Sequence, residues 1–263
     1  MRKIITTLGF GVIFLGVVAC QTAKSLPPGV SPVQATWLYG KVGTASRVSK
    51  KGYLYNYTSY PPDGDPWLPI LKGRLKSGAV APAVIWLHGC TGHTNQTALA
   101  IRTFQLLGYT VFAPDSFARP GRSALCGMGG MDDRVSMRHE ELKYALSQIR
   151  TYPWIDQKHL VLGGFSEGSQ AVAAWRGHEF KAHVLIGTDC RHNSGSPNSP
   201  DGVPVLNLVG SKDRWGYGGG CNLSGPQRSS ASIVKIFPGL GHGILQSPEV
   251  RNDIRKFIES LNP

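Results

Sequence analysis

Short apolar runs that alternate with helical patterns constrain the fold of this chain most. Six such runs lie at 83–87, 109–113, 159–162, 182–186, 205–209 and 233–237. Each has the length and composition of a strand that is buried on both faces of a sheet. Helical patterns stand between and after them at 95–107, 132–150, 167–175 and 248–261. This alternation predicts an α/β fold, with a mainly parallel sheet and helices on both of its faces.

Two further strand candidates precede this pattern, at 51–58 and 69–76, joined by the turn residues 61–64. The chain has 263 residues, of which 41% are hydrophobic, so a sizeable core can be buried and global disorder is excluded. Its 33 glycines and 18 prolines follow no repeat period, which excludes collagen-like and coiled-coil folds. We therefore expect one loop-rich domain over residues 50–263.

The chain is basic, with 28 Lys and Arg against 16 Asp and Glu and a net charge of +12. Nucleic-acid binding would need this charge to be clustered on one face or in one motif, whereas the basic residues are scattered along the sequence. A basic surface also suits an anionic cell envelope. We therefore expect no nucleic-acid partner.

The N-terminus has the layout of an export signal. Arg2 and Lys3 precede the apolar segment 4–18, which is shorter than the ~20 residues that span a bilayer. Small residues and then Cys20 follow, and these residues resemble the lipobox of bacterial lipoproteins. The resemblance implies a signal peptide over 1–19, a lipid on Cys20 and a tether over 20–49. It also implies that the protein is anchored to a membrane in the bacterial cell envelope. An ordinary signal peptide with an incidental cysteine is the alternative.

The cysteine count agrees with export. If Cys20 carries lipid, four cysteines remain, namely Cys90, Cys126, Cys190 and Cys221. An even number of cysteines in an oxidising compartment favours disulfide bonds. Four cysteines allow three pairings, and the count alone does not choose among them.

One pentapeptide, Gly164-Phe165-Ser166-Glu167-Gly168, has the form G-x-S-x-G between a predicted strand and a predicted helix. This is the context of a nucleophile elbow, a strained turn that raises a serine hydroxyl above the edge of a sheet. Ser166 is therefore the candidate nucleophile. A serine hydroxyl needs a base that an acid orients, and in this type of fold the chain order is serine, acid, histidine.

The candidate acid and base lie downstream of Ser166. His242 stands in a glycine loop between the last strand and the last helix, which places it at the same edge of the sheet as Ser166. Asp213 follows the carboxyl end of the next-to-last strand. We expect Asp213 and His242 to complete a catalytic triad. The rival candidates are Asp189 for the acid and His178, His183 and His192 for the base.

Two backbone N–H groups are candidates for an oxyanion hole. One belongs to Glu167, directly after the nucleophile, and the other to Cys90 in the loop 88–92. His88 is expected to organise that loop by hydrogen bonding. No pair of histidines or acids falls at ligand spacing, so we expect neither a metal nor a cofactor.

Together these motifs resemble the α/β-hydrolase superfamily, and within it the dienelactone-hydrolase-like branch. The resemblance covers about residues 50–262 and rests on the elbow, the loop 88–92, the segment 115–126 and the loops of Asp213 and His242. Dienelactone hydrolases proper use a cysteine nucleophile, whereas this elbow carries a serine. The resemblance implies a serine carboxylesterase that acts on small-molecule esters. A peptidase similar to prolyl oligopeptidases and a non-catalytic envelope binding protein are the alternatives.

The loops after the fourth and seventh predicted strands are expected to line the substrate pocket. Their candidate contact residues are Phe117, Arg119, Arg122, Trp215 and Tyr217. The arginines would either bind an anionic part of the substrate or hold the loops through backbone carbonyls. The superfamily's strand order, taken over by resemblance, implies the disulfides Cys90–Cys126 and Cys190–Cys221. Four free thiols, or a Cys90 kept reduced as a second nucleophile, are the alternatives.

Overall fold

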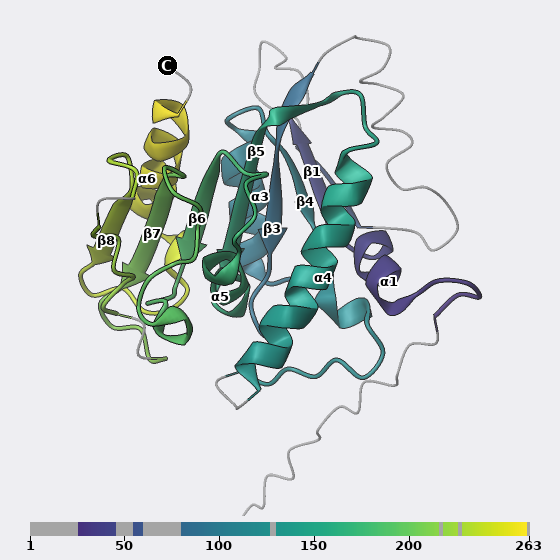
Figure 1. Cartoon of the computed structure of the whole chain (residues 1–263), viewed down its shortest axis with the longest axis horizontal. Helices are drawn as coiled ribbons and strands as arrows, with labels where there is room; N and C mark the ends of the chain where they lie inside the picture. The colour runs from purple at the N-terminus through teal and green to yellow at the C-terminus, as the bar shows by residue number, and fades with distance from the viewer. Residues whose placement is uncertain are drawn as a thin grey trace, which may run out of the picture.

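The structure is a computed structural model, shown in Figure 1. It describes residues 26–45, 55–59, 80–126, 130–215, 218–225 and 228–261. The predicted signal peptide, Cys20, the predicted strand at 69–76 and Tyr217 lie outside these residues, so they stay predictions. No helix of the described part is both long and apolar enough to cross a membrane.

The described chain forms one eight-stranded sheet in the order β2-β1-β4-β3-β5-β6-β7-β8 (Figure 1). β1 runs antiparallel to both of its neighbours, and all the other pairs are parallel. The strands are β1 (Lys41–Ala45), β2 (Tyr55–Ser59), β3 (Ala81–Leu87), β4 (Thr110–Ala113), β5 (Ile155–Phe165), β6 (Ala182–Ile186), β7 (Val205–Gly210) and β8 (Ile233–Phe237). The predicted mainly parallel α/β sheet is confirmed.

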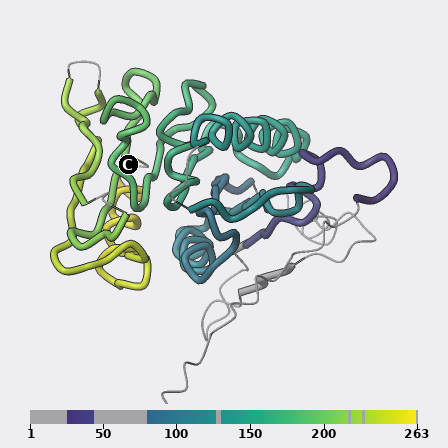
Figure 2. The backbone as a smooth tube through the Cα atoms, turned by 90° about the horizontal axis from the view of Figure 1, so that it is seen from below, coloured from purple at the N-terminus to yellow at the C-terminus, as the bar shows by residue number. Residues whose placement is uncertain are grey.

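Helices cover both faces of the sheet. They are α1 (Pro32–Leu38), α3 (Asn95–Gln105), α4 (Met131–Ile149), α5 (Glu167–Ala174) and α6 (Pro248–Ser260), with short 3-10 turns η1 (Ser116–Ala118), η2 (Arg191–Asn193) and η3 (Ile244–Gln246). α1, α4 and α5 pack into one hydrophobic core, and α3 and α6 pack into a second core on the other face. Figure 2 shows α4 and α3 on opposite sides of the sheet. Two cores with the sheet between them explain why the central strands are apolar on both faces.

The folded part begins earlier than the predicted boundary at residue 50. Within the expected tether, Ser31 caps α1 and forms a reciprocal capping box with Gln34. Trp37 of α1 is 4% exposed and stacks on Phe112 of β4, with 5.4 Å between the ring centroids. β1 then joins the sheet beside β4. Residues 32–45 are therefore part of the domain rather than a tether, because Trp37 packs on Phe112 and β1 pairs with β4.

Two disulfide bonds join loops at the carboxyl edge of the sheet. Cys90 after β3 pairs with Cys126, with a Cα–Cα distance of 5.3 Å. Cys190 after β6 pairs with Cys221 after β7, with a Cα–Cα distance of 5.1 Å. Both distances lie in the range that disulfides need. The pairing taken over by resemblance is confirmed.

Candidate active site

Ser166 occupies a strained turn between β5 and α5. Its φ of 55° and ψ of −117° are unusual for a residue with a side chain, and such strain persists only where the surroundings hold it. The flanking glycines make the turn possible, since a Cβ on Gly164 would lie 2.6 Å from the backbone of Gly168, and one on Gly168 would overlap the Leu87 carbonyl. The Ser166 N–H donates to the Ile186 carbonyl at 2.9 Å. The sequence motif therefore forms the sharp strand-to-helix turn that it predicts.

His242 and Asp213 are brought together at the same edge. The His242 Nδ1–H donates to Asp213 Oδ2 at 2.6 Å, and the Asp213 side chain is fully buried. The other Asp213 oxygen, Oδ1, accepts the backbone N–H of Trp215 at 2.9 Å. The His242 ring also lies 4.8 Å from the ring of Phe165, the residue before Ser166. The carboxylate is thus held in place and orients the imidazole beside the elbow.

Burial governs the charge of His242. Loss of solvent around the ring lowers the pKa of His242 below its ordinary value of 6.5, although the Asp213 carboxylate opposes that shift. The imidazole is therefore neutral at neutral pH, the form that can accept a proton.

The rival residues lie in other surroundings. Asp189 makes a salt bridge of 2.7 Å with Arg191 at the surface. His183 is completely buried in β6, next to Phe180, where burial lowers the pKa of His183 to about 3. His178 and His192 stand after α5 and in η2. No described hydrogen bond joins any of the three histidines to an acid, whereas His242 has such a bond.

The loop 88–92 lies directly against Ser166. A Cβ on Gly89 would lie 3.4 Å from the Cβ of Ser166. The buried His88 holds this loop, because its Nδ1–H donates to the Gly89 carbonyl at 2.7 Å and its Nε2 accepts the Ser116 N–H at 2.9 Å. His88 thus has the loop-organising role expected of it. Cys90 and Glu167 border the same pocket as Ser166.

The sequence did not predict a buried ion triad next to Ser166. Arg122 Nη2 lies 2.5 Å from Glu167 Oε1, and Arg134 Nε lies 3.1 Å from Glu167 Oε2. The side chains of all three residues are at most 6% exposed. The carboxylate next to Ser166 is therefore paired with two guanidinium groups, one from the loop after β4 and one from α4.

The pocket at Ser166 differs in part from the predicted one. Its lining residues are Cys90, Leu125, Cys126, Met131, Arg134, Ser166, Glu167 and Trp215. Of the predicted contact residues that the structure describes, Trp215 lines this pocket, whereas Phe117, Arg119 and Arg122 do not. Arg119 instead binds Glu140 at 2.9 Å and Glu141 at 3.0 Å, and Arg122 lies over the Phe117 ring. These contacts favour a loop-holding role for Arg119 and Arg122.

One cluster of possible metal ligands occurs in the described residues, formed by His88, His93 and Asp115. It does not fit a cation. The Nε2 lone pair of His88 already accepts the Ser116 N–H, and an Arg138 guanidinium nitrogen lies 3.2 Å away. Burial lowers the pKa of His93 to about 3, and the charges of Lys41 and Arg138 contribute. The positive charges of Lys41 and Arg138 that help to lower this pKa would also oppose a bound cation.

The fold has counterparts among solved structures. Est1E from Butyrivibrio proteoclasticus is similar at a TM-score of 0.52 and 13% identity, over 84% of this chain and 98% of that one. Its structure with bound ferulic acid is similar at a TM-score of 0.50 and 15% identity, over 69% and 90%. Esterase PE8 is similar at 0.51 and 17%, over 70% and 94%. The chain has the α/β-hydrolase fold.

Sequence comparison adds no closer relative. No protein-family model matches the chain, and no curated protein matches it. At 13–17% identity the structural likeness shows the fold alone, so the chemistry has to be argued from the residues at the elbow.

Proposed function

We propose that this protein is a serine hydrolase that cleaves carboxylic esters through an acyl-serine intermediate. The observation that supports this most is the 2.6 Å hydrogen bond between His242 and the buried Asp213, beside the strained turn of Ser166. Nucleophile, base and acid also follow the chain order of this fold. A binding protein would have no need of this arrangement.

The proposed reaction has two halves. His242 accepts the Ser166 hydroxyl proton through Nε2 while the Ser166 oxygen attacks the ester carbonyl. Asp213 keeps the imidazole in the Nδ1–H tautomer and stabilises the imidazolium. The proton then passes to the leaving alcohol, and water, activated by the same histidine, releases the acid and restores Ser166.

The backbone N–H groups of Cys90 and Glu167 are the proposed oxyanion donors. Their fixed positions support this role, because the Cys90–Cys126 disulfide constrains one residue and the Arg122–Glu167–Arg134 ion triad constrains the other. Preformed donors do not have to reorganise when charge develops on the substrate oxygen.

The pocket residues Leu125, Met131 and Trp215 are the proposed contacts for an apolar part of the ester. The alternative roles of Arg119 and Arg122 can be separated by comparing an acidic ester with its neutral analogue in Arg119→Gln and Arg122→Gln. Equal losses on both esters support loop holding, which the ion pairs of these residues favour. A loss confined to the acidic ester would instead support anion binding.

We also propose that the protein acts in the bacterial cell envelope, anchored by lipid on Cys20. The lipobox-like residues 17–20 and the two disulfide bonds support an oxidising, extracytoplasmic compartment. Cys20→Ser should move the protein from the membrane fraction to the soluble fraction. A mature chain that starts well after residue 20 would contradict the proposal.

The function is tested with p-nitrophenyl esters of graded acyl length and with peptide amides as parallel substrates. We expect hydrolysis of the esters and its loss in Ser166→Ala, with an unchanged unfolding temperature as the control for the fold. Turnover of amides alone would favour the peptidase alternative. A lack of turnover on both substrate classes would favour a binding protein.

A further inference from the structure

A buried polar network lies next to the loop 88–92. It joins His88 of that loop, Ser116 of the loop after β4, and Arg138 and Glu141 of α4. The Ser116 N–H donates to His88 Nε2 at 2.9 Å, and the Ser116 hydroxyl donates to Glu141 Oε1 at 2.8 Å. Glu141 Oε2 lies 3.3 Å from Arg138 Nη1, and that nitrogen lies 3.2 Å from His88 Nε2. Three separate segments therefore meet at one imidazole.

Arg138 holds His88 at two points. Its Nη1 lies beside the imidazole Nε2, and its Nη2 donates to the His88 backbone carbonyl at 3.2 Å. Both residues are completely buried, so bulk water does not compete for these contacts. A guanidinium presents its donors in a rigid fork, and this fork fixes the imidazole relative to the backbone of the same residue.

The donors around Nε2 also determine the tautomer of His88. The Ser116 N–H and the Arg138 guanidinium both approach this nitrogen, so Nε2 has the lone pair and Nδ1 carries the proton. Burial, together with the charge of Arg138, lowers the pKa of His88 well below 6.5 and keeps the imidazole neutral. Asp115 Oδ1 lies 3.7 Å from Nε2, too far for a hydrogen bond. The Nδ1–H is thus the donor of this imidazole.

That donor binds the peptide group between Gly89 and Cys90. The His88 Nδ1–H donates to the Gly89 carbonyl at 2.7 Å, and the Gly92 N–H donates to the same oxygen at 3.1 Å. The Cys90 N–H stands at the other end of this peptide group. Hydrogen bonds in a chain polarise one another. Two donors on the carbonyl therefore make the Cys90 N–H a stronger donor and fix its direction.

Stability alone gives little reason to bury the ion pair of Arg138 and Glu141. Both side chains are fully buried, and taking two charges out of water costs desolvation energy. Apolar residues of similar volume often stabilise a core as well or better. The described contacts of Arg138 go to His88 and to Glu141, which favours a task at the loop 88–92.

We propose that Arg138 is a positioning residue for the oxyanion hole and acts through His88 on the peptide group that carries the Cys90 N–H. Glu141 offsets the charge of Arg138. The inference rests on the proposed ester hydrolysis, with Cys90 as one oxyanion donor. The donor is oriented and polarised before charge develops on the substrate oxygen, which favours the transition state over the bound ester. Arg138 should therefore influence kcat more than KM.

The test uses two variants of the full chain. Arg138→Lys keeps a positive charge beside Glu141 but loses the fork that holds the imidazole and the carbonyl of His88. Arg138→Met combined with Glu141→Leu removes both charges, so that neither is left buried without its partner. The second variant keeps the test decisive if the first does not fold.

Arg228→Lys is the matched control. The Arg228 guanidinium also donates to backbone carbonyls, those of Pro197 and Ser199, in a segment that leads into β7. Arg228 does not line the pocket at Ser166. The control therefore removes a similar guanidinium fork without touching the proposed oxyanion hole.

Each protein is measured for kcat and KM on p-nitrophenyl acetate and for inhibition by an aryl trifluoromethyl ketone. The Ser166 oxygen forms a bond to the ketone carbon, its proton passes to His242, and the carbonyl electron pair moves onto the ketone oxygen. The hemiketal oxyanion is an analogue of the charge that develops during ester hydrolysis. Its binding thus reports on the oxyanion donors directly.

We expect each folded Arg138 variant to lower kcat about tenfold or more, with KM within about threefold of the parent, and to weaken ketone inhibition by a similar factor to kcat. Arg228→Lys should leave all three values within about twofold of the parent. Near-parent kcat in the Arg138 variants, a loss confined to KM, or an equal loss in Arg228→Lys overturns the inference.

Unfolding temperatures complete the test. Failure of both Arg138 variants to fold would assign the ion pair to stability alone and would also overturn the inference. A parent protein that neither hydrolyses esters nor binds the ketone would refute the proposed function itself. That result is distinguishable, because it is seen without any substitution.

Discussion

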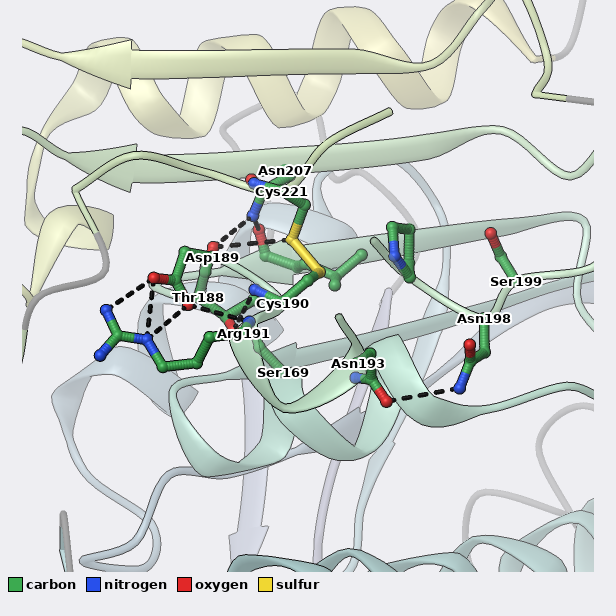
Figure 3. The surroundings of a disulfide bond; sticks show 12 residues. Ser169, Thr188, Asp189, Cys190, Arg191, Asn193, Asn198, Ser199, Asn207 and Cys221 are labelled. Atoms are coloured by element: carbon green, nitrogen blue, oxygen red, sulfur yellow. Dashed lines mark hydrogen bonds and ion pairs between the residues drawn. A yellow bond between two sulfur atoms is a disulfide. The ribbon is translucent and has the colours of Figure 1, made fainter. Parts of the chain in front are cut away.

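The two disulfide bonds hold opposite sides of the candidate site by different means. The Cys90–Cys126 bridge borders the pocket with Ser166, next to the charged Arg122–Glu167–Arg134 triad. The Cys190–Cys221 bridge is buried and lies next to the neutral Asn207 side chain, while the Asp189–Arg191 ion pair lies beside it at the surface (Figure 3). There the Asn207 amide donates to the Thr188 carbonyl at 3.0 Å and accepts the Cys221 N–H at 2.7 Å (Figure 3).

The difference indicates separate tasks for the two sides. On the charged side, the disulfide and the ion triad fix the residues whose N–H groups are the proposed oxyanion donors. On the neutral side, the second disulfide and Asn207 join the ends of β6 and β7, and β7 leads to Asp213. The charged side should therefore influence the chemical step directly, and the neutral side should act mainly through stability and the placement of the acid.

We expect the largest effect on kcat from a change of Asp213, the proposed acid, which follows β7. Asp213→Asn should lower kcat by roughly 10⁴-fold, because the amide favours the wrong imidazole tautomer. Asp189→Asn is the matched control, since this acid pairs with Arg191 at the surface, and its kcat should stay within about twofold of the parent. Steady-state kinetics on one p-nitrophenyl ester measures both variants. Near-normal turnover by Asp213→Asn and loss in Asp189→Asn would show that the acid is misassigned.

Removing the Glu167 carboxylate from the charged side should lower the free energy of unfolding more than removing the Asn207 amide from the neutral side. Glu167→Ala removes the carboxylate that two buried guanidinium groups share, which should cost about 3–5 kcal/mol of unfolding free energy together with turnover. Asn207→Ala leaves buried backbone groups without a partner, for about 1–3 kcal/mol. Chemical denaturation measures both losses, and equal losses would remove the distinction between the two sides.

Removing each disulfide separates activity from stability. The bridges span 36 and 31 residues, so each double Cys→Ser variant should lose a similar ~4 kcal/mol on the chain-entropy model. Activity should differ, since only Cys90 and Cys126 border the pocket. Measured below the unfolding transition, kcat should fall for the Cys90–Cys126 variant and stay near the parent for the other. Equal kcat values would place both bridges in a purely structural role.

Sequence reasoning succeeded where a local pattern determines a place in the fold. The apolar runs and the glycine-flanked Ser166 each constrain their own backbone within a few residues. Asp213 and His242 follow strands of a parallel sheet, and the carboxyl ends of such strands share one edge. The disulfide pairing depended on strand order, which the superfamily resemblance supplied.

The features that were missed depend on contacts between distant segments. Arg134 looks like any arginine in the first turn of a helix, and its pairing with Glu167 exists only because the N-terminus of α4 reaches the elbow. Likewise, residues 41–45 (KVGTA) have no strong alternation, and β1 forms because β4 offers an open edge and Trp37 covers Phe112. Tertiary packing decides such segments, and propensity does not.

The pH profile is the smallest of the expected effects. Burial lowers the pKa of His242, so the imidazole should be neutral above that pKa. We expect kcat/KM to rise with pH, with the midpoint of the rise below pH 6.5, and to be level at pH 7. Trp215 packs near the His242 ring, at 6.1 Å between centroids. Trp215→Ala admits solvent and should move the midpoint upward, toward 6.5. A midpoint that stays in place would show that Trp215 does not desolvate the base.

The most direct measurement of the central claim is covalent labelling of the folded protein with a fluorophosphonate, followed by peptide mapping. An activated serine forms a stable adduct with this reagent, whereas an ordinary surface serine does not. We predict one adduct per chain, located on Ser166, absent in Ser166→Ala and formed far more slowly in His242→Ala. A folded protein that stays unlabelled, or that carries its adduct on another serine, would contradict the assignment of Ser166 as a nucleophile activated by His242 and Asp213.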